Sequence, residues 1–480
     1  MGAVSLDPFL DCDIRGVYGH EITELFARDL GLAVGSVAGR GPVVVAGDYR
    51  THTPVLMAAL CDGLRQAGAD VVSCGQIPTP VYYHARHDLG IDAGIMVTAS
   101  HNPPEYAGFK PILGHLPITP GQIDDLRHRM GHRPAPGMVS GGLRMHDALP
   151  SYEESIRQMA RGLLSESAAG LRVVVDCGSG CFGPTAPPVL RALGFDVVER
   201  FTEPDGTFPH RPSNVALREA LEPCIGAVRE TGSAFGVAYD GDGDRIAVID
   251  DQGSPVPNDV LVALLAGDAL DRHPGGAVVY DVKCSAIVRE AVQRAGGVPV
   301  VQKSGHTYIK TAMIERHAAF GGEASGHLFY HELHGGDDAL YSTLRVAALV
   351  LRSGKPLSAL SAAVPRYATT PDLRIGCEGD RGAVIRAIRE ALRAQTDVRL
   401  SDVDGVRADF AEGWGLARVS VTEPVITLRF EAREPGDLRP LMERFLAGAP
   451  AGLRQAVFEA TAVGDGCQPD EGGRNDAAHR

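Results

Sequence analysis

The stretch Asp240-Gly-Asp-Gly-Asp-Arg245 gathers three carboxylates at alternate positions of one short loop. Strand-like runs at residues 235–239 and 246–249 flank it, and the glycines let the loop curl so that its acids converge on one cation. Ligands that are all oxygen favour a hard ion such as Mg²⁺ over Zn²⁺. An arginine beside three acids indicates that an anion, such as a phosphate, joins the metal. An EF-hand is excluded because its sixth position requires Gly and is Arg245 here. The remaining alternative is a solvated acidic turn.

A second polar loop, Thr98-Ala-Ser-His-Asn-Pro103, follows the apolar run at residues 94–97. Ligands of α/β proteins bind at the carboxyl ends of strands, so this loop is a candidate site. Ser100 offers a nucleophile, and His101 lies next to it in the sequence. A serine hydrolase is disfavoured because no GxSxG elbow surrounds Ser100 and adjacent residues rarely face each other. The alternative is a turn without chemistry.

A third stretch, Gly178-Ser-Gly-Cys-Phe-Gly183, fits the dinucleotide-binding pattern GxGxxG, with Glu199 about twenty residues further on. The match is weak, because glycine is abundant in this chain and Pro184, Pro187 and Pro188 crowd the start of the following helix. We therefore favour a tight strand-to-helix turn and keep an NAD(P)-dependent oxidoreductase as the alternative.

Two further loops carry polar groups that could bind hydroxyls or a phosphate. Gly321-Gly-Glu-Ala-Ser-Gly-His327 offers groups that bind hydroxyls, and Arg418-Val-Ser-Val-Thr-Glu-Pro424 combines a cation with two hydroxyls in a turn. Each loop, taken alone, is better explained as an ordinary surface loop.

The elements that must position these loops form a loose repeat. Apolar strands at residues 43–47, 172–176 and 277–281 each end at or just before an Asp and lead through a helix to second strands at 69–73, 195–199 and 298–302. Valine-rich strands that alternate with helices are typical of buried parallel or mixed sheets. The pattern predicts three similar α/β mixed-sheet domains. A fourth, α+β region is predicted from strands at 418–421 and 426–432 and a helix near 438–446.

We expect the following boundaries: an α/β domain with the Ser100 loop at 1–150, one with the metal loop at 151–252, one with the sugar-binding loop at 253–366, and the smaller α+β domain at 367–460. A helix at 152–164 opens the second domain, and residues 356–365 are interpreted as the connector to the fourth. The polar, Gly-rich residues 461–480 are interpreted as a disordered tail.

Composition excludes several classes of function. The chain has 480 residues and a net charge of −14, which argues against nucleic acid or an anionic membrane as the main partner. No run approaches the roughly 18 apolar residues that span a bilayer, and we expect no signal peptide. Nine cysteines without a CxxC pair are typical of reduced cytosolic thiols, so we expect a cytoplasmic protein.

The motifs TASHNP, DGDGDR, GEASGH and Arg-x-Ser-x-Thr-Glu-Pro occur in this order and at wide spacing. In this combination the chain resembles the α-D-phosphohexomutase family, most closely bacterial phosphomannomutase/phosphoglucomutase, over about residues 9 to 460. Lesser matches include Asp13-Ile-Arg-Gly16, Pro78-Thr-Pro80 and Asp281-Val-Lys-Cys-Ser285. The resemblance implies four domains around a central cleft, with each domain contributing a loop.

The resemblance also implies a role for each candidate residue. Ser100 would be the phosphoserine, and Asp240, Asp242 and Asp244 would hold Mg²⁺ together with it. Catalytic roles would fall to Ser100, Arg15, His101, Lys110 and Arg245. Substrate binding would involve Lys283, His306, Glu323, Ser325, His327, Arg418, Ser420 and Thr422, with Glu323 and Ser325 at sugar hydroxyls and Arg418, Ser420 and Thr422 at the phosphate that is not transferred.

The implied activity interconverts a hexose 6-phosphate and a hexose 1-phosphate, of mannose and/or glucose, through a 1,6-bisphosphate. Glucose 1,6-bisphosphate, or its mannose equivalent, would act as activator, and the protein would be a monomer or homodimer whose partners are small hexose phosphates. Departures from the family pattern occur at Cys12, Ala107, Ser179 and Val421. One alternative is a phosphoglucosamine mutase, a subgroup that usually has Gln where Ala324 stands. The other is a non-catalytic sugar-phosphate-binding protein, suggested by Ala107 and Val421.

Overall fold

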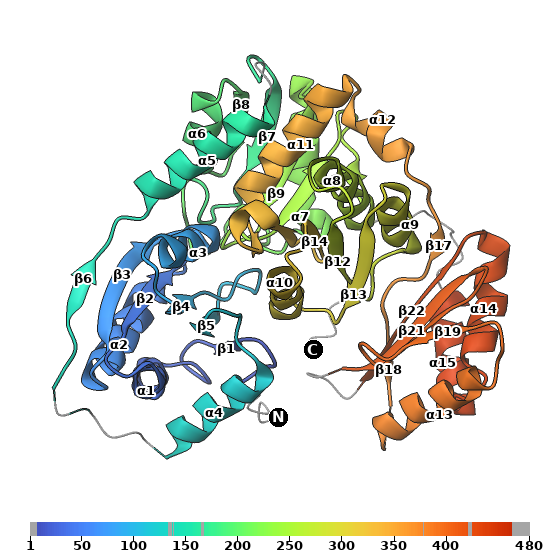
Figure 1. The fold of residues 1–480 in the computed structure, drawn as a ribbon, viewed down its shortest axis with the longest axis horizontal. Coiled ribbons are helices and arrows are strands. Elements are labelled where there is room, and N and C mark those ends of the chain that lie inside the picture. The colour runs from blue at the N-terminus through green and yellow to red at the C-terminus, as the bar shows by residue number, and fades with distance from the viewer. Residues whose placement is uncertain are drawn as a thin grey trace. The chain divides into compact units, whose positions relative to one another are not determined.

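The computed structural model describes residues 7–132, 137, 139–164, 168–377, 379–420 and 425–462 (Figure 1). The chain divides into two compact units. Unit 1 comprises Met1–Val256, Met313–His317 and Ser325–Leu360, and unit 2 comprises Pro257–Ala312, Ala318–Ala324 and Ser361–Arg480. The Ser100 and metal loops lie in unit 1, and most of the predicted substrate-binding residues lie in unit 2.

The first sheet of unit 1 is mixed and has the order β1-β5-β4-β2-β3-β6. Its central strand β2 pairs in parallel with β3 and β4, and β5 returns antiparallel to β4. The strands are β1 (Ile14–Val17), β2 (Pro42–Gly47), β3 (Asp70–Gln76), β4 (Ala93–Val97), β5 (Tyr106–Leu113) and β6 (Leu143–Met145). The accompanying helices are α1 (Glu24–Ala38), α2 (Thr53–Gln66), α3 (Thr79–Asp88) and α4 (Pro120–Gly131).

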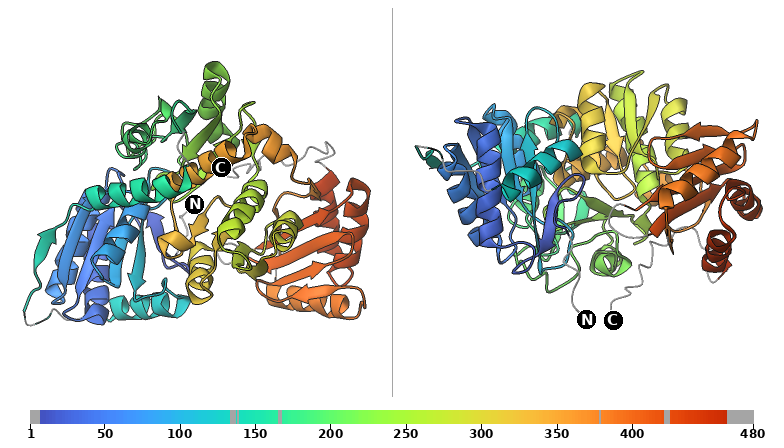
Figure 2. Two further views of the ribbon diagram at one scale, coloured as in Figure 1. Left: turned by 45° about the horizontal axis from the view of Figure 1, so that its top comes forward. Right: turned by 90° about the horizontal axis from the view of Figure 1, so that it is seen from below.

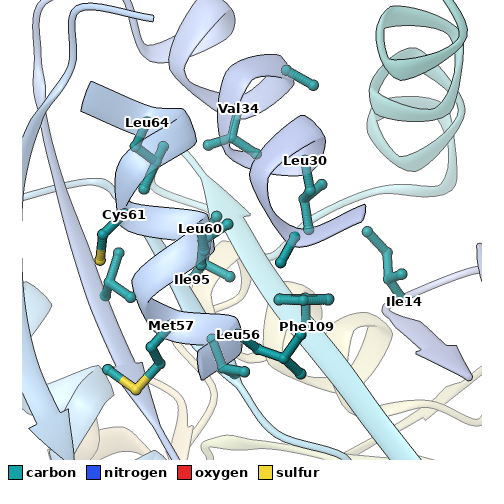
Figure 3. Packing of buried hydrophobic residues seen from close by; sticks show 14 of the residues in the cluster. Ile14, Leu30, Val34, Leu56, Met57, Leu60, Cys61, Leu64, Ile95 and Phe109 are labelled. Atoms are coloured by element: carbon teal, nitrogen blue, oxygen red, sulfur yellow. The ribbon is translucent and has the colours of Figure 1, made fainter. Parts of the chain in front are cut away.

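A continuous apolar core fixes this sheet and therefore the end of β4 that carries Ser100. Leu30 of α1, Leu60 of α2 and Phe109 of β5 are fully buried in it (Figure 3). Helices α1 and α2 pack closely because glycines face the neighbouring backbone: a Cβ at Gly63 would stand 2.0 Å from the Arg28 carbonyl oxygen. Such close packing restricts the movement of the loops at the sheet edge.

The second sheet of unit 1 repeats the pattern, with the order β11-β10-β9-β7-β8. Strand β7 pairs in parallel with β8 and β9, and β10 is antiparallel to β9. Its elements are α5 (Leu149–Leu163), β7 (Arg172–Asp176), α6 (Ala186–Ala192), β8 (Asp196–Arg200), α7 (Arg218–Thr231), β9 (Phe235–Tyr239), β10 (Ile246–Ile249) and β11 (Pro255–Val256). Unit 1 also holds β15 (Leu328–Tyr330), η1 (His331–Leu333), β16 (Gly336–Asp337) and α11 (Ala339–Ser353), with β15 antiparallel to β16.

In unit 2, β12 (Ala277–Asp281) is parallel to both β13 (Val298–Gln302) and β14 (Phe320–Gly322), which is the same arrangement a third time. Helices α8 (Asn258–Arg272) and α9 (Ala286–Arg294) belong to this region, and α10 (His306–Glu315) extends into unit 1. The Ser100, Asp240 and Glu323 loops follow β4, β9 and β14. The three loops therefore occupy equivalent places in the three repeats.

The C-terminal part of unit 2 is a separate sheet, ordered β17-β22-β21-β20-β19 with β18 also paired to β22. Figure 2 shows it in orange and red with its own helices. The elements are β17 (Ala368–Thr369), β18 (Leu373–Gly376), α13 (Arg381–Arg393), β19 (Arg399–Ser401), β20 (Val406–Asp409), β21 (Gly413–Val419), β22 (Val425–Ala432), η2 (Pro435–Asp437), α14 (Leu438–Phe445) and α15 (Ala451–Ala462). The predicted fold class, three α/β mixed-sheet domains and a smaller α+β domain, is confirmed.

Two local predictions were wrong. The strand expected at 418–421 is β21, which starts at Gly413 and ends at Val419. The first half of β21 was not predicted because it contains two glycines, which are rare in strands. The packing requires glycine there, since a Cβ at Gly415 would stand 2.5 Å from the Phe445 ring. The connector at 356–365 contains helix α12 (Leu357–Ala362), whose Leu357 is fully buried. Residues 463–480, most of the expected tail, lie outside the described residues.

Candidate active site

Ser100 is buried in the loop that follows β4, and its backbone has a φ of 51°, in the left-handed region. This conformation is strained for a residue with a side chain. The Ser100 N–H donates to Thr98 Oγ1 at 2.8 Å, and the Ser100 hydroxyl donates to Asp240 Oδ2 at 2.8 Å. The structure thus joins the first and second predicted motifs, which lie 140 residues apart in the chain.

The Asp240–Arg245 loop curls as the glycine spacing predicts. Gly243 has a φ of 79°, and a Cβ at Gly241 would stand 2.6 Å from the Ser100 carbonyl oxygen. Asp240 Oδ1 accepts the backbone N–H groups of Gly243 and Arg245. Each of the three buried acids places a carboxylate oxygen within 4.8 Å of the others.

Lys110, on β5, donates to Asp242 Oδ2 at 2.8 Å and to Asp244 Oδ2 at 2.6 Å. The other oxygens of these acids, Asp242 Oδ1 and Asp244 Oδ1, are buried and have no hydrogen-bond partner among the described residues. A buried carboxylate oxygen without a donor is costly unless a cation or a water meets it. The cluster therefore fits a metal ion held by oxygen ligands.

Burial and mutual repulsion with Asp242 and Asp244 raise the pKa of Asp240 well above its usual value. Burial opposes ionisation of Asp244 too, but Lys110, His327 and Arg245 outweigh it and hold the pKa of Asp244 well below its usual value. Burial likewise opposes the charge on Lys110, yet Asp242 and Asp244 leave the pKa of Lys110 raised. The site thus combines a protonated lysine with at least one firmly ionised carboxylate.

Arg15 bonds to the Ser100 loop, and His101 lies beside the Ser100 hydroxyl. Arg15 donates to the Asn102 side chain at 2.5 Å, to the Ala99 carbonyl at 3.1 Å and to Asp13 at 2.8 Å. His101 Nδ1 lies 3.3 Å from Ser100 Oγ. Burial, together with Arg245 and Arg15, lowers the pKa of His101 well below its usual value, so its ring is neutral near pH 7.

Arg245, His327 and Asp337 form a hydrogen-bonded chain beside the metal loop. Arg245 Nε donates to His327 Nε2 at 2.8 Å, and His327 Nδ1 lies 2.7 Å from Asp337 Oδ2. An accepting Nε2 assigns the ring proton to Nδ1, which then donates to Asp337. The chain fixes the orientation of Arg245, which follows directly after the third acid of the cluster.

The Glu323 loop is divided between the two units. Glu323 is buried directly after β14 in unit 2, whereas the half-buried Ser325 belongs to unit 1. In unit 2, Asn258 donates from its side chain to the Ala324 carbonyl at 2.8 Å. Asn258 therefore anchors this loop at its midpoint.

The cationic candidates of unit 2 are paired with acids of the same unit. Lys283 lies 3.4 Å from Asp372, and Arg418, at the end of β21, is bonded to Asp404. Burial lowers the pKa of Lys283, but Asp281 and Asp372 outweigh it and leave that pKa raised. His306 begins α10 and is half-buried, and the buried Ser420 donates its N–H to the Val425 carbonyl. Thr422 and Val421 lie outside the described residues.

Sequence reasoning assigned no role to several residues that hold the site together, although Thr79 lies in the matched stretch Pro78-Thr-Pro80. Thr79 donates its hydroxyl to Asp242 Oδ2 at 2.7 Å, and its N–H bonds to the Asp242 carbonyl. Arg50 and Asp337 also escaped notice. Thr79 before Pro80 is typical of the start of a helix, and Asp337 follows an unremarkable turn. The one sequence feature that pointed toward Arg50 was Asp48, an aspartate at the end of a predicted strand two residues earlier.

The GxGxxG stretch is a tight turn and not the start of a long helix, because α6 begins only at Ala186. Ser179 has a φ of 59°, and the Cys181 N–H donates to the Gly241 carbonyl at 3.0 Å. A Cβ at Gly180 would stand 2.8 Å from that same carbonyl oxygen. The glycines therefore allow this turn to support the metal loop, which accounts for them without a dinucleotide.

Four family models match the chain. They are described as phosphoglucomutase/phosphomannomutase alpha/beta/alpha domain I at residues 9–133, domain II at 150–253, domain III at 257–367, and the C-terminal domain at 385–447. The chain belongs to the phosphoglucomutase/phosphomannomutase family. It is a phosphohexomutase.

Individual relatives agree with this assignment. A phosphomannomutase/phosphoglucomutase of Pseudomonas putida is 37% identical over 440 residues, which cover 90% of this chain and 93% of that protein. A phosphoglucomutase of Neisseria gonorrhoeae is 32% identical and covers 93% of this chain and 97% of its own. The crystal structure of a phosphoglucomutase/phosphomannomutase family protein from Burkholderia thailandensis superposes with a TM-score of 0.85 at 36% identity, over 96% of this chain and 99% of that one. In the described residues, no helix combines the length and apolarity needed to cross a bilayer.

Proposed function

We propose that the enzyme interconverts hexose 6-phosphates and hexose 1-phosphates of mannose and/or glucose, using Ser100 as a phosphoserine and Mg²⁺ as cofactor. The observation that carries this proposal is the 2.8 Å hydrogen bond between Ser100 Oγ and Asp240 Oδ2, within a buried three-carboxylate cluster. A hydroxyl in this position is next to the ligands of a cation, where a phosphoryl group on Oγ would have its charge neutralised.

In the first half-reaction the bond between Ser100 Oγ and phosphorus breaks, and a bond forms from phosphorus to the free sugar hydroxyl. The hydroxyl proton passes to a base, and the released Ser100 oxygen takes up a proton to become a hydroxyl. Lys110 is held protonated by Asp242 and Asp244, so we assign it to charge stabilisation and the base to a histidine. Mg²⁺, held by Asp240, Asp242, Asp244 and a phosphoserine oxygen, would neutralise charge on the phosphoryl group.

In the second half-reaction the bisphosphate turns over, and its other phosphoryl group returns to Ser100. A sugar oxygen–phosphorus bond breaks and that oxygen takes up a proton, while the Ser100 hydroxyl loses its proton as the bond from Oγ to phosphorus forms again. Asp240 Oδ2 accepts the Ser100 hydroxyl at 2.8 Å but is a proposed metal ligand, so we assign the proton to His101, whose neutral ring has Nδ1 3.3 Å from Oγ. Arg245, oriented by His327, would bind the phosphoryl oxygens during transfer.

The substrate would be held by groups from the other loops. We propose Glu323 and Ser325 for sugar hydroxyls, and Arg418, Ser420 and Thr422, with Lys283 and His306, for the phosphate that is not transferred. Glucose 1,6-bisphosphate, or its mannose equivalent, would load Ser100. We further propose a cytoplasmic monomer or homodimer with four domains at the boundaries given above.

The test is a coupled assay with glucose 1-phosphate, mannose 1-phosphate and glucosamine 6-phosphate, with glucose 1,6-bisphosphate as activator, combined with intact mass. We expect turnover of the first two substrates and a fraction of molecules about 80 Da heavier, the mass of one phosphoryl group. A preference for glucosamine 6-phosphate would assign the chain to the phosphoglucosamine mutases. Binding of all three sugars to folded protein without turnover would support the non-catalytic alternative.

A further inference from the structure

Arg50 is one of the largest fully buried side chains of the described residues, and it lies directly beneath the Ser100 loop. Its guanidinium has five N–H groups, and each has an acceptor. Nε donates to Asp48 Oδ2 at 3.2 Å. Nη1 donates to the carbonyls of Pro103 and Tyr106 at 2.6 and 3.1 Å, and Nη2 to those of Ser100 and Asn102 at 3.0 and 2.6 Å.

These four carbonyls belong to one short segment, residues 100–106, which begins at the nucleophile and runs into β5. A single rigid group therefore fixes the shape of the whole loop, including the Ser100 peptide with its φ of 51°. A strained backbone conformation persists only where several surrounding contacts hold it in place. The described residues offer the Ser100 carbonyl no other side-chain donor, so Arg50 is the main source of that constraint.

The Arg50 guanidinium is itself held from two further sides. Asp48, at the end of β2, accepts its backbone N–H at 3.0 Å as well as its Nε, and is fixed by the Thr53 hydroxyl at 2.6 Å. The ring of Phe208 covers the guanidinium at 5.1 Å. Arg15 also bonds to this loop, at the Ala99 carbonyl and the Asn102 side chain. The nucleophile loop is thus bound by a buried arginine and by a more exposed one.

We propose that Arg50 is a positioning residue for phosphoryl transfer, which holds Ser100 Oγ at the metal cluster without touching substrate. This inference rests on the proposed role of Ser100 as phosphoserine. Loss of the Arg50 hydrogen bonds would let the loop relax toward an unstrained φ and move Oγ away from Asp240. Because small misplacements of reacting atoms cost about 100-fold in rate, the effect should appear in the transfer step and not in sugar-phosphate binding.

The experiment uses wild type, Arg50→Lys, Arg50→Met and a matched control, Arg345→Met. Arg345 is equally buried, but it lies on α11 against Tyr330 and Tyr341, away from the Ser100 loop. Each protein is loaded with glucose 1,6-bisphosphate, and transfer to glucose 1-phosphate is followed in a single turnover, per phosphorylated molecule. The Kd of glucose 1-phosphate for the unphosphorylated protein is measured by calorimetry, and the melting temperature by calorimetric scan.

We expect the transfer rate to fall about 100-fold in Arg50→Met and about tenfold in Arg50→Lys, which keeps the charge but has only three donors. The Kd should change by less than about twofold in both variants, and Arg345→Met should lose stability without a change in transfer rate. If Arg50→Met does not fold, the transfer rate of Arg50→Lys tests the proposal. Amide hydrogen exchange of residues 98–106 is then measured in Arg50→Lys as well, and we expect it to be faster than in the wild type.

A normal transfer rate in either folded Arg50 variant would overturn the proposal, as would an equal loss of rate in Arg345→Met. A wild-type protein that takes up no phosphate at Ser100 would instead refute the proposed function. The two failures are therefore separable.

Discussion

Three strand-end aspartates occupy equivalent places in the three repeats, and they are used in two different ways. Asp48, Asp176 and Asp281 end or follow β2, β7 and β12, and each accepts the backbone N–H two residues further on. In unit 1 the acid also binds a buried arginine: Arg50 at Asp48, and Arg211 at Asp176 with an Nε–Oδ1 distance of 2.8 Å. In unit 2 no arginine is bonded to Asp281 among the described residues; it accepts the Ser304 hydroxyl at 2.5 Å.

The two arginines support the loops proposed to carry out chemistry. Arg50 donates to the Ser100 carbonyl, and Arg211 donates to the Tyr239 carbonyl at 2.8 Å, directly before Asp240. Lys283, which stands two residues after Asp281 as Arg50 does after Asp48, keeps 23% of its side chain exposed and lies 3.4 Å from Asp372. Buried, fully bonded cations fix geometry, whereas a partly exposed lysine can exchange its acid partner for a substrate phosphate. The strand-end aspartates of unit 1 thus bind buried arginines, whereas Lys283, beside the third aspartate, keeps the exposure that its proposed role in phosphate binding requires.

The largest effect should follow from removing the group that the first repeat positions. Ser100→Ala should lose the phosphoryl adduct and at least about 1,000-fold in rate, because no other hydroxyl replaces the covalent nucleophile. Intact mass and the coupled assay measure both quantities. Ser36→Ala, at the exposed end of α1, is the control and should keep both. Near-normal turnover in Ser100→Ala would end the assignment.

Metal dependence tests the loop that the second repeat positions. Exhaustive chelation should abolish turnover, with recovery on adding Mg²⁺, and Asp242→Asn should lower kcat at least about 100-fold because the phosphoryl charge is then poorly neutralised. Asp196→Asn, which removes only an exposed partner of Arg172, is the control. Full activity of protein shown by elemental analysis to be free of metal would contradict the prediction.

These loops could be predicted from sequence because their chemistry is local. The spacing of Asp240, Asp242 and Asp244 and the strand before Ser100 are visible in a few residues. The role of Arg50 could not be found in this way, since its four carbonyl acceptors lie about 50 positions further along the chain and only the tertiary fold brings them together. Asp337 could not be found either, because its role is visible only once the fold places it beside His327. The first half of β21 was missed because its glycines follow close packing and not a strand propensity: Gly415 packs against Phe445, and Gly413 against the backbone of Glu431.

Removing a cation in unit 2 should act on binding and not on chemistry. Arg418→Ala should lower kcat/KM by roughly 10- to 100-fold for both the 1-phosphate and the 6-phosphate, because either phosphate occupies this loop in one half-reaction. Arg439→Ala, an exposed arginine of the same domain paired with Glu443, is the control. An effect confined to one substrate would show that Arg418 does not hold the phosphate in both half-reactions.

Asp338 offers a contrast to the acids that are paired with arginine. It is buried at the start of α11 and accepts from the Tyr152 hydroxyl at 2.7 Å and the Tyr341 N–H at 3.0 Å, and burial raises its pKa to about 7. Because the folded protein binds this proton more tightly than the unfolded chain does, protonated Asp338 adds to the free energy of unfolding. The addition is full below the unfolded pKa of about 4 and is lost as pH rises to about 7. In Asp338→Asn the free energy of unfolding should no longer fall by this amount, which is up to about 4 kcal/mol between pH 4 and pH 8. Denaturant titrations of both proteins across this range measure it, and parallel pH profiles would refute it.

The smallest effect should be discrimination between glucose and mannose. The two sugars share the hydroxyls at C3 and C4 and differ only at C2. If Glu323 and Ser325 bind the C3 and C4 hydroxyls, as proposed, no buried hydrogen bond of this loop distinguishes the epimers. The same contacts also survive turnover of the bisphosphate, since C3 and C4 nearly exchange places when the ring is turned end to end.

An unpaired polar group at C2 costs about 1–3 kcal/mol if it is buried and little if it stays hydrated. Glucosamine adds an ammonium group that needs an acid, and Glu323 is the one acid in residues 321–327. We therefore expect kcat/KM for glucose and mannose 1-phosphates to agree within about tenfold, and glucosamine 6-phosphate to be poor. A glucose-to-mannose ratio above about 1,000, more than 4 kcal/mol at the transition state, would mean that a residue outside this loop reads C2. Ala324→Gln sharpens the test, because it should improve the relative rate with glucosamine 6-phosphate if position 324 faces C2.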